Sequence, residues 1–433
     1  MTKEKNWLSN KAFRSKGILV LILTFCIQYM SCCLSSDSYN VLVVYLPKLY
    51  GWTETQIANA YTIGGLVAIA AGLWFGHLIS KIGPVKVAFG SFLVMGIAQI
   101  AMAVSGSFAV YTITWIVLKS LGVSLAYCLA TITSNWFVKY RGRALGINTM
   151  GGPLETATGV ALLTWGCGTI GFAKIYSIFG VAAIVIGFLF LFLLKDKPED
   201  CGLLPDGDTD VSAMMTSEVK EENSWSIKKI FTTKDSILLI IGMTIVNFVM
   251  MCMMIYFIAR FLSAGYEQGV IVSAMSIGGL CAIPVSYLYG WLDDKFGTPK
   301  ACVVYTVVLV TSTVALALAD KGYVFLIISA FGVASATGGL PNLHPSISSY
   351  VYGRNQFMYC HKYAYVVTSI ATAFCATFMA QFGALGVAQG GTASDGYVIA
   401  YWIMTAALVA AIACFCLIGK GYDEKNNLTL GGK

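Results

Sequence analysis

The chain has 433 residues, of which 57% are hydrophobic and only 11% are charged. Soluble domains carry about 25% charged residues, so the composition excludes a soluble globular protein. Apolar runs of about 18 or more residues recur along the sequence, and each is long enough to cross the ~30 Å hydrocarbon core of a bilayer. The runs do not alternate polar and apolar residues as the strands of a membrane β-barrel do. The sequence therefore predicts an all-α membrane protein with many spans.

Twelve spans are predicted in chain order, as six plus six. The first six cover 17–47, 55–79, 85–104, 107–134, 144–170 and 173–194. The second six cover 236–262, 267–290, 300–319, 322–347, 357–383 and 397–419. We therefore expect an N-terminal six-helix bundle at 1–194, a linker at 195–235, a C-terminal six-helix bundle at 236–420 and a tail at 421–433.

The linker is acidic and polar at first and then becomes basic and amphipathic over residues 225–231. We expect this last piece either to lie on the membrane surface or to belong to a solvated loop.

Basic residues are distributed unevenly between the two sides of the predicted spans. Of the 28 Lys and Arg residues, 22 fall on one side, which includes both termini, the linker and the tail. The positive-inside rule then places both termini in the cytoplasm. The net charge of +7 does not indicate nucleic-acid binding, because the basic residues lie in short loops. We expect a monomer that crosses the plasma or inner membrane many times.

Catalytic and metal-binding motifs are missing from the sequence. The 13 cysteines lie mostly inside apolar spans and form no CxxC pair, so neither a metal site nor a disulfide framework is expected. There is also no nucleotide-binding P-loop, nucleophile elbow or zinc motif. We therefore predict a protein that is not an enzyme and needs no cofactor.

The second half of the sequence repeats the first at an offset of 214 residues. Residues 62–86 and 276–300 are identical at eleven of 25 positions without a gap. Internal repeats indicate a duplicated structural unit. Glycines recur in both copies, and we expect Gly76 and Gly290 to permit close helix approach and Gly83 and Gly297 to permit a tight reversal. Asp294 is expected to act at a helix terminus, whereas the first copy has Ser80 in its place.

The repeated loop resembles a known family. Residues 290–297 read GWLDDKFG, which looks like the loop motif of the major facilitator superfamily, and here it includes Asp294 and Lys295. A second stretch at 135–146, NWFVKYRGRALG with Arg141, is similar to the loop after the fourth span in the oxalate/formate antiporter and monocarboxylate transporter branches. The resemblance implies two six-helix bundles related by a pseudo-two-fold axis, with alternating access to a site near mid-membrane.

Charges deep in the predicted spans are functional candidates, because a charge in hydrocarbon is costly. They are Asp37, Lys119, Glu155 and Lys362, and all lie in spans that the resemblance places at or beside the central cavity. We predict that Asp37 and Glu155 couple transport to protons and that Lys119 and Lys362 bind substrate. Polar neighbours complete the predicted substrate site: His361, Tyr39, Asn40, Asn247, Tyr256 and Arg260.

Several of these residues, and His344, have a structural alternative. Lys119, Asp37 and Glu155 are alternatively structural ion pairs, and Glu155 follows a proline break at Pro153. Arg260 lies near a span end, where an arginine usually snorkels to water. His344 is either a gate or proton group, or it packs at a helix end.

The sequence departs from the oxalate/formate pattern at one point. That branch uses an arginine in the eighth span, and residues 284–287 read PVSY here. This favours a monocarboxylate or a larger amphipathic anion over a small dicarboxylate. We predict a secondary transporter that carries an organic anion by proton symport or by anion exchange. The alternatives are an efflux pump for lipophilic compounds and, from another class, a membrane sensor without transport activity.

Overall fold

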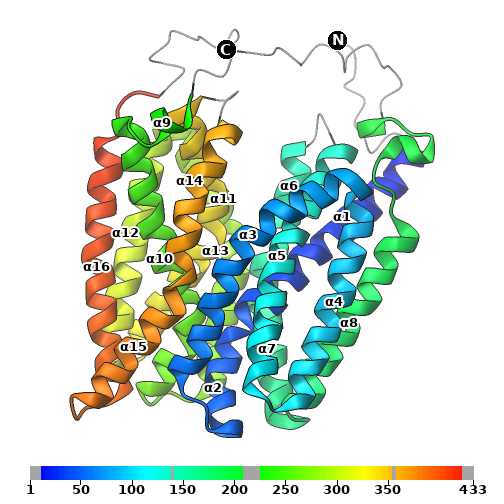
Figure 1. The fold of residues 1–433 in the computed structure, drawn as a ribbon. Coiled ribbons are helices and arrows are strands. Elements are labelled where there is room, and N and C mark those ends of the chain that lie inside the picture. The colour runs from blue at the N-terminus through cyan, green and yellow to red at the C-terminus, as the bar shows by residue number, and fades with distance from the viewer. Residues whose placement is uncertain (1–10, 138–140, 208–224, 354–356, 422–433) are drawn as a thin grey trace. The chain divides into compact units, whose positions relative to one another are not determined.

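A computed structural model describes residues 11–137, 141–207, 225–353 and 357–421. It is helical throughout these ranges (Figure 1), as the sequence predicted. Ten of its helices are long and apolar enough to cross a membrane, or eleven if one bent pair, Glu54–Gly72 and Trp74–Ile82, is taken as a single span. The predicted span at 144–170 is formed by α6 (Arg141–Thr149) and α7 (Gly151–Thr169), which meet at Met150.

The chain divides into two compact units that do not coincide with the predicted bundles. Unit 1 consists of Met1–Ser38, Val67–Glu155 and Leu162–Lys220. Its helices are α1 (Lys11–Cys32), the π-helix η2 (Cys33–Asp37), the second part of α3 (Glu54–Ile82), α4 (Pro84–Ser105), α5 (Phe108–Trp136), α6, most of α7, α8 (Phe172–Leu193), η3 (Pro198–Cys201) and η4 (Pro205–Gly207). Glycines bring the apolar helices of this unit together: a Cβ at Gly180 in α8 would lie 2.8 Å from the carbonyl oxygen of Gly96 in α4.

Unit 2 consists of Tyr39–Leu66, Thr156–Ala161 and Glu221–Lys433. Its helices are α2 (Tyr39–Tyr50), the first part of α3, α9 (Ile227–Ile230), α10 (Lys234–Ser263), α11 (Gln268–Phe296), α12 (Thr298–Ala317), η5 (Ala319–Lys321), α13 (Tyr323–Tyr352), α14 (Phe357–Ala373), α15 (Cys375–Ala388) and α16 (Ala393–Leu417). Within it, α10, α12 and α16 lie side by side (Figure 1).

The reversals of the repeat have the predicted geometry in both copies. Gly83 joins α3 to α4 as a single residue with φ of 90°, and Gly297 joins α11 to α12 with φ of 85°. Side chains with a Cβ rarely adopt this conformation, which explains the glycine at both places. The copies therefore share local structure as well as sequence.

The prediction for Gly76 and Gly290 was wrong. A Cβ at either position would meet nothing within 4 Å among the described residues. Close approach occurs about three turns earlier in each helix. An added Cβ would lie 3.0 Å from Ala373 Cβ at Gly65 and 2.6 Å from the carbonyl oxygen of Ala330 at Gly278. The repeat therefore makes its close contacts through its first glycines.

The two ends of the predicted linker pack on different units. At its start, Asp196 Oδ1 accepts a 2.8 Å hydrogen bond from the backbone N–H of Val85 at the beginning of α4. At its end, Trp225 is buried with its ring edge-on to Tyr352, and Ile230 of α9 is fully buried. The amphipathic piece therefore packs against unit 2 through Trp225 and Ile230. Residues 208–224 and the tail from 422 lie outside the described residues.

Candidate functional site

A break in the first long helix creates the acid cluster, by which we mean Asp37, Glu155 and Lys119. Between α1 and α2 the chain makes the π-helical turn Cys33–Asp37. Such turns interrupt the regular α-helical ladder and occur often at functional sites. Asp37 is the last residue of this turn and is only 7% exposed.

Two glycines bring the other members of the acid cluster to this turn. A Cβ at Gly122 in α5 would lie 2.6 Å from Ser35 Oγ, and a Cβ at Gly151 in α7 would lie 2.9 Å from the carbonyl oxygen of Phe25. Lys119 precedes Gly122 by three residues, and Glu155 follows Gly151 by four. Each charge therefore lies one helical turn from a glycine that permits contact with the first helix.

Glu155 is the most deeply buried member of the acid cluster. Its side chain is 0% exposed, and neither oxygen makes a hydrogen bond of ordinary geometry within the described chain. The Asp37 carboxyl and the Cys33 thiol still lie close enough to interact with it. Asp37, Glu155 and Lys119 also all act electrostatically on the Cys32 thiol. The structure thus gathers the three charges around one point, whereas their roles, and any ion pair of Lys119 with an acid, stay predictions.

Tyr39, Asn40 and Tyr256, which were predicted to bind substrate, are buried among one another in unit 2. Asn40 Nδ2 donates a 2.7 Å hydrogen bond to the carbonyl oxygen of Met254, and the hydroxyls of Tyr39 and Tyr256 are 3.5 Å apart. The ring of Tyr39 contacts that of Tyr61 at 4.8 Å between centroids, and the ring of Tyr256 contacts that of Tyr397 at 5.6 Å.

A carboxylate ends this row of rings. The Tyr397 hydroxyl donates to Glu54 Oε2 at the first turn of α3. We call Tyr39, Tyr61, Tyr256, Tyr397 and Glu54 the tyrosine cluster. It joins α2 and α3 to α10 and α16, and sequence reasoning missed both Glu54 and Tyr397. Four aromatic residues far apart in the sequence carry no local pattern that would have revealed the cluster.

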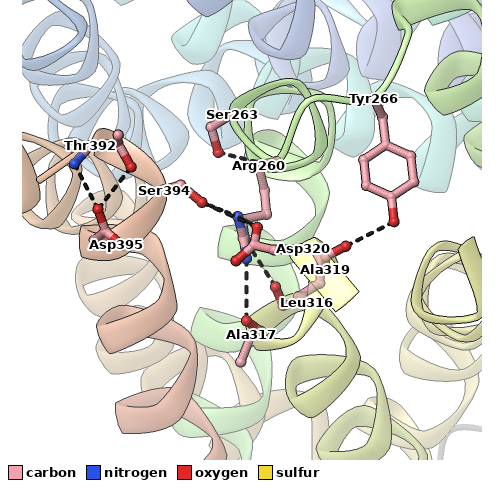
Figure 2. Close-up of polar contacts among 10 residues, drawn as sticks. All are labelled: Arg260, Ser263, Tyr266, Leu316, Ala317, Ala319, Asp320, Thr392, Ser394 and Asp395. Carbon is pink, nitrogen blue, oxygen red and sulfur yellow. Dashed lines mark hydrogen bonds and ion pairs between the residues drawn. The ribbon is translucent and has the colours of Figure 1, made fainter. Parts of the chain in front are cut away.

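Arg260 is fully buried at the end of α10, and it holds neighbouring elements of unit 2 (Figure 2). It donates to the carbonyl oxygens of Leu316 and Ala317 at 2.9 and 3.2 Å, to Ser394 Oγ at 2.6 Å and to Asp320 Oδ1 at 3.1 Å. The last carbonyls of a helix lack partners within it, so Arg260 caps the C-terminus of α12. These contacts favour a structural role over substrate binding. The expected alternative, snorkelling to water, was wrong, because Arg260 is 0% exposed.

The remaining predicted binding residues have varied surroundings. Asn247 is buried and donates to the carbonyl oxygen of Met243 in its own helix at 2.8 Å. Lys362 is exposed, with Nζ 4.9 Å from the centre of the Tyr363 ring. His361 Nδ1 lies 2.9 Å from Ser348 Oγ of α13. The two residues adjacent on α14 therefore present one exposed cation and one anchored imidazole.

The loop motif acts partly through residues that the sequence did not single out. Ser346 of α13 donates a short hydrogen bond to Asp293, the neighbour of Asp294, and Lys295 Nζ lies 4.5 Å from the centre of the Trp291 ring. In the first copy, which has Ser80 at the position of Asp294, Asp196 supplies a carboxylate to the start of α4. The side chains of Asp294 and Arg141 lie outside the described part of the chain.

Long apolar helices, a duplicated unit and charges buried within the spans are typical of one class of proteins, the multi-pass secondary transporters. The match to a family model agrees: residues 23–360 match the model of the Major Facilitator Superfamily. The chain belongs to this superfamily, whose members are transporters and not enzymes.

Solved structures of transporters share the fold. A peptide transporter matches with a TM-score of 0.71 at 15% identity, covering 93% of this chain and 94% of its own. A D-xylose–proton symporter matches with a TM-score of 0.70 at 15% identity, covering 94% and 98%. A bacterial homologue of the human lysosomal transporter Spinster, in an inward-facing conformation, matches with a TM-score of 0.68 at 14% identity, covering 94% and 97%.

A curated relative matches over a shorter region. The riboflavin transporter RibJ of Trypanosoma brucei brucei (strain 927/4 GUTat10.1) is 25% identical over 146 residues, which are 33% of this chain and 25% of the relative. The chain therefore aligns with about a quarter of that protein. None of these matches singles out the oxalate/formate or monocarboxylate branch, so that finer resemblance stays a prediction.

Proposed function

We propose that this transporter carries a small organic anion together with a proton. The observation that supports the proposal is the acid cluster, in which fully buried Glu155 and nearly buried Asp37 interact and share their surroundings with Lys119. Charges inside a membrane protein are costly, and their presence at buried positions usually serves binding or proton transfer. Structural ion pairing explains one acid beside one lysine but leaves the second buried acid without a role.

The charges suggest how substrate and proton are coupled. Two negative charges that lie close together in a buried site repel each other, and a proton on one carboxyl group removes that repulsion. With both acids ionised, the cluster has a net charge of −1. A substrate carboxylate that binds Lys119 adds a further negative charge, which uptake of a proton by the acid pair offsets. Substrate and proton then travel together, and exchange of one anion for another needs no change of protonation.

Lys362, on α14 of unit 2, is a separate candidate cation for the substrate carboxylate. The sequence has no arginine at 284–287, so the second cation that would hold a small dicarboxylate is missing from the eighth span. A monocarboxylate or a larger anion therefore fits better. This substrate class is what the resemblance to the oxalate/formate and monocarboxylate branches implies. We further propose a plasma or inner membrane location with cytoplasmic termini, on the distribution of basic residues.

One observation favours a second candidate, an uncharged polycyclic substrate. The curated relative is a riboflavin transporter, although the match covers only a third of this chain. Such a substrate would be carried without help from Lys119 or Lys362. Efflux of lipophilic compounds predicts the same independence, and a sensor without transport activity predicts no flux at all.

Purified protein in liposomes distinguishes these functions. The vesicles are loaded with carboxylates from formate to aromatic acids, or with riboflavin, and labelled substrate is added with and without an inward proton gradient. We expect the gradient to drive carboxylate accumulation, and we expect Lys119→Ala and Lys362→Ala to reduce it. Lys174→Ala is the control, because Lys174 is an exposed lysine near the start of α8.

Other outcomes would overturn the proposal. Accumulation of an anion in both lysine variants at the wild-type rate would exclude a carboxylate held by these cations. Uptake of riboflavin alone would establish the second candidate. Anion exchange without any response to the proton gradient would keep the substrate class and remove proton coupling.

A further inference from the structure

Three rings from two helices meet in unit 2, and none of them is explained by the proposed proton site. The ring centroids of His344 in α13 and His361 in α14 are 4.8 Å apart at 70°, in an edge-on arrangement. The ring of Tyr365 lies 5.6 Å from His361 at 24°, which is a stacked arrangement, and 5.6 Å from His344. We call these three residues the histidine cluster.

The histidine cluster is held from its buried side. His344 is 7% exposed and lies between two prolines inside α13, Pro341 and Pro345. Ser348, one turn further along, donates its hydroxyl hydrogen to the carbonyl oxygen of His344 at 2.9 Å. A serine hydroxyl has one hydrogen, so we assign the 2.9 Å contact with His361 as an Nδ1–H donation to Ser348 Oγ. This tautomer leaves His361 Nε2 as a hydrogen-bond acceptor.

The other side of the histidine cluster is open. Tyr365 is 48% exposed, and His361 is half-buried. Lys362 precedes Tyr365 by three residues on α14, so the two side chains lie on one face of the helix. Val366 and Ile370, also exposed, continue that face for the next turn. Along α14, a cation is thus followed by an aromatic face and then by apolar side chains.

We propose that the histidine cluster is a platform for the planar aromatic ring of the transported anion, with Lys362 beside it for the carboxylate. This inference rests on the proposed function and narrows its substrate to aromatic or heteroaromatic monocarboxylates. A planar ring extends the stack of His361 and Tyr365, as offset or edge-on aromatic contacts prefer. A saturated ring of similar size presents hydrogens on both faces and cannot stack in this way. His361 Nε2 accepts a hydrogen bond from an O–H or N–H group on the ring.

The test uses a pair of acids that differ in ring planarity while sharing charge and approximate size. Benzoate and cyclohexanecarboxylate compete with labelled substrate for uptake into the liposomes described above. We expect benzoate to compete roughly 2- to 12-fold more strongly, the range that aromatic pair energies give. Tyr365→Leu removes this preference, whereas Tyr365→Phe retains it. Tyr323→Leu is the control, because Tyr323 is an exposed tyrosine at the opposite end of α13.

Failure of this inference and failure of the proposed function give different results. If carboxylates are transported and both ring acids compete equally in the wild type, the platform is refuted and the anion transporter stands. That result would favour an interfacial role for Tyr365, because aromatic residues are common at the lipid interface.

If no carboxylate is transported, the platform is tested with uncharged ligands. Benzamide and cyclohexanecarboxamide are compared for their ability to raise the unfolding temperature of the purified protein, because a ligand stabilises the state that it binds. Stabilisation by benzamide alone, lost in Tyr365→Leu, supports the platform. Equal shifts, or shifts that persist in that variant, refute it.

Discussion

Asn40 donates a hydrogen bond to the carbonyl oxygen of Met254, and these two residues are 214 positions apart, which is the offset of the internal repeat. The contact therefore joins equivalent positions of the two copies, on α2 and α10. Two equivalent positions can meet only where the related helices cross. This crossing is narrow and buried: Asn40 is 0% and Met254 is 4% exposed.

We expect Asn40→Leu to destabilise the protein, because a buried amide that bridges two helices is lost. The expected cost is about 1 kcal/mol, typical of one hydrogen bond. Asn247→Leu is the matched control, since the Asn247 amide is also buried but donates within its own helix. The comparison is made by thermal unfolding in detergent. Equal unfolding temperatures for the two variants would show that the α2–α10 hydrogen bond contributes no more than one within a single helix.

The four motif glycines separate into two pairs on alanine substitution. Gly83→Ala and Gly297→Ala place a Cβ on a backbone with positive φ, at a cost on the order of 1 kcal/mol. Gly83→Ala should be the worse of the two, because its Cβ also collides with the Asp196 carboxylate. Gly76→Ala and Gly290→Ala meet open space in helices and should be neutral or stabilising. Unfolding temperatures that rank the pairs in the opposite order would contradict the described reversals.

Substitutions of Arg260 test whether this residue stabilises the fold or binds substrate. Arg260→Leu removes four hydrogen bonds and leaves Asp320 without its ion-pair partner, so we expect a large loss of folded protein. Arg260→Lys should be only partly tolerated, because an ammonium cannot reproduce the planar fork of donors. Asp320→Asn should be mild, since Asp320 is 44% exposed. The readout is monodisperse yield and unfolding temperature. Normal stability of Arg260→Lys with a raised KM for transport would restore Arg260 to the substrate site.

The bond between Tyr397 and Glu54 is tested by a double-mutant cycle. Tyr397→Phe and Glu54→Gln each remove the same contact between α16 and α3. The double variant should therefore be about as stable as the less stable of the two single variants. Each single change should cost on the order of 1 kcal/mol. Thr62→Ala, which loses a hydroxyl contact with Thr377 in the same unit, should add independently to either change. Full additivity of Tyr397→Phe and Glu54→Gln would mean that the two side chains do not interact.

The sequence was sufficient for the helical fold, the superfamily and the reversals at Gly83 and Gly297. These depend on local properties, namely apolar length, repeat offset and the positive φ that glycine tolerates. The deep charges could also be recognised, because a charge in an apolar run is conspicuous wherever its partners lie.

Other features depend on which helices approach one another, and the sequence could not supply them. The π-helical turn before Asp37 has no residue pattern of its own. Gly65 and Gly278 differ from Gly76 and Gly290 only in having another helix opposite them. Asp196 binds the start of α4 from a segment 111 residues beyond its partner Val85. Likewise, the sequence does not show that the ring of Tyr365 contacts the rings of His344 and His361.

The central claim is that Asp37 and Glu155 carry the proton, and Glu155→Gln tests it most directly. The amide keeps the size of the side chain but cannot take up or release a proton. In liposomes, we expect this variant to retain exchange of internal for external substrate while losing accumulation driven by a proton gradient. Glu267→Gln, at an exposed acid before α11, should behave as the wild type. Undiminished gradient-driven accumulation by a folded Glu155→Gln protein would contradict the claim.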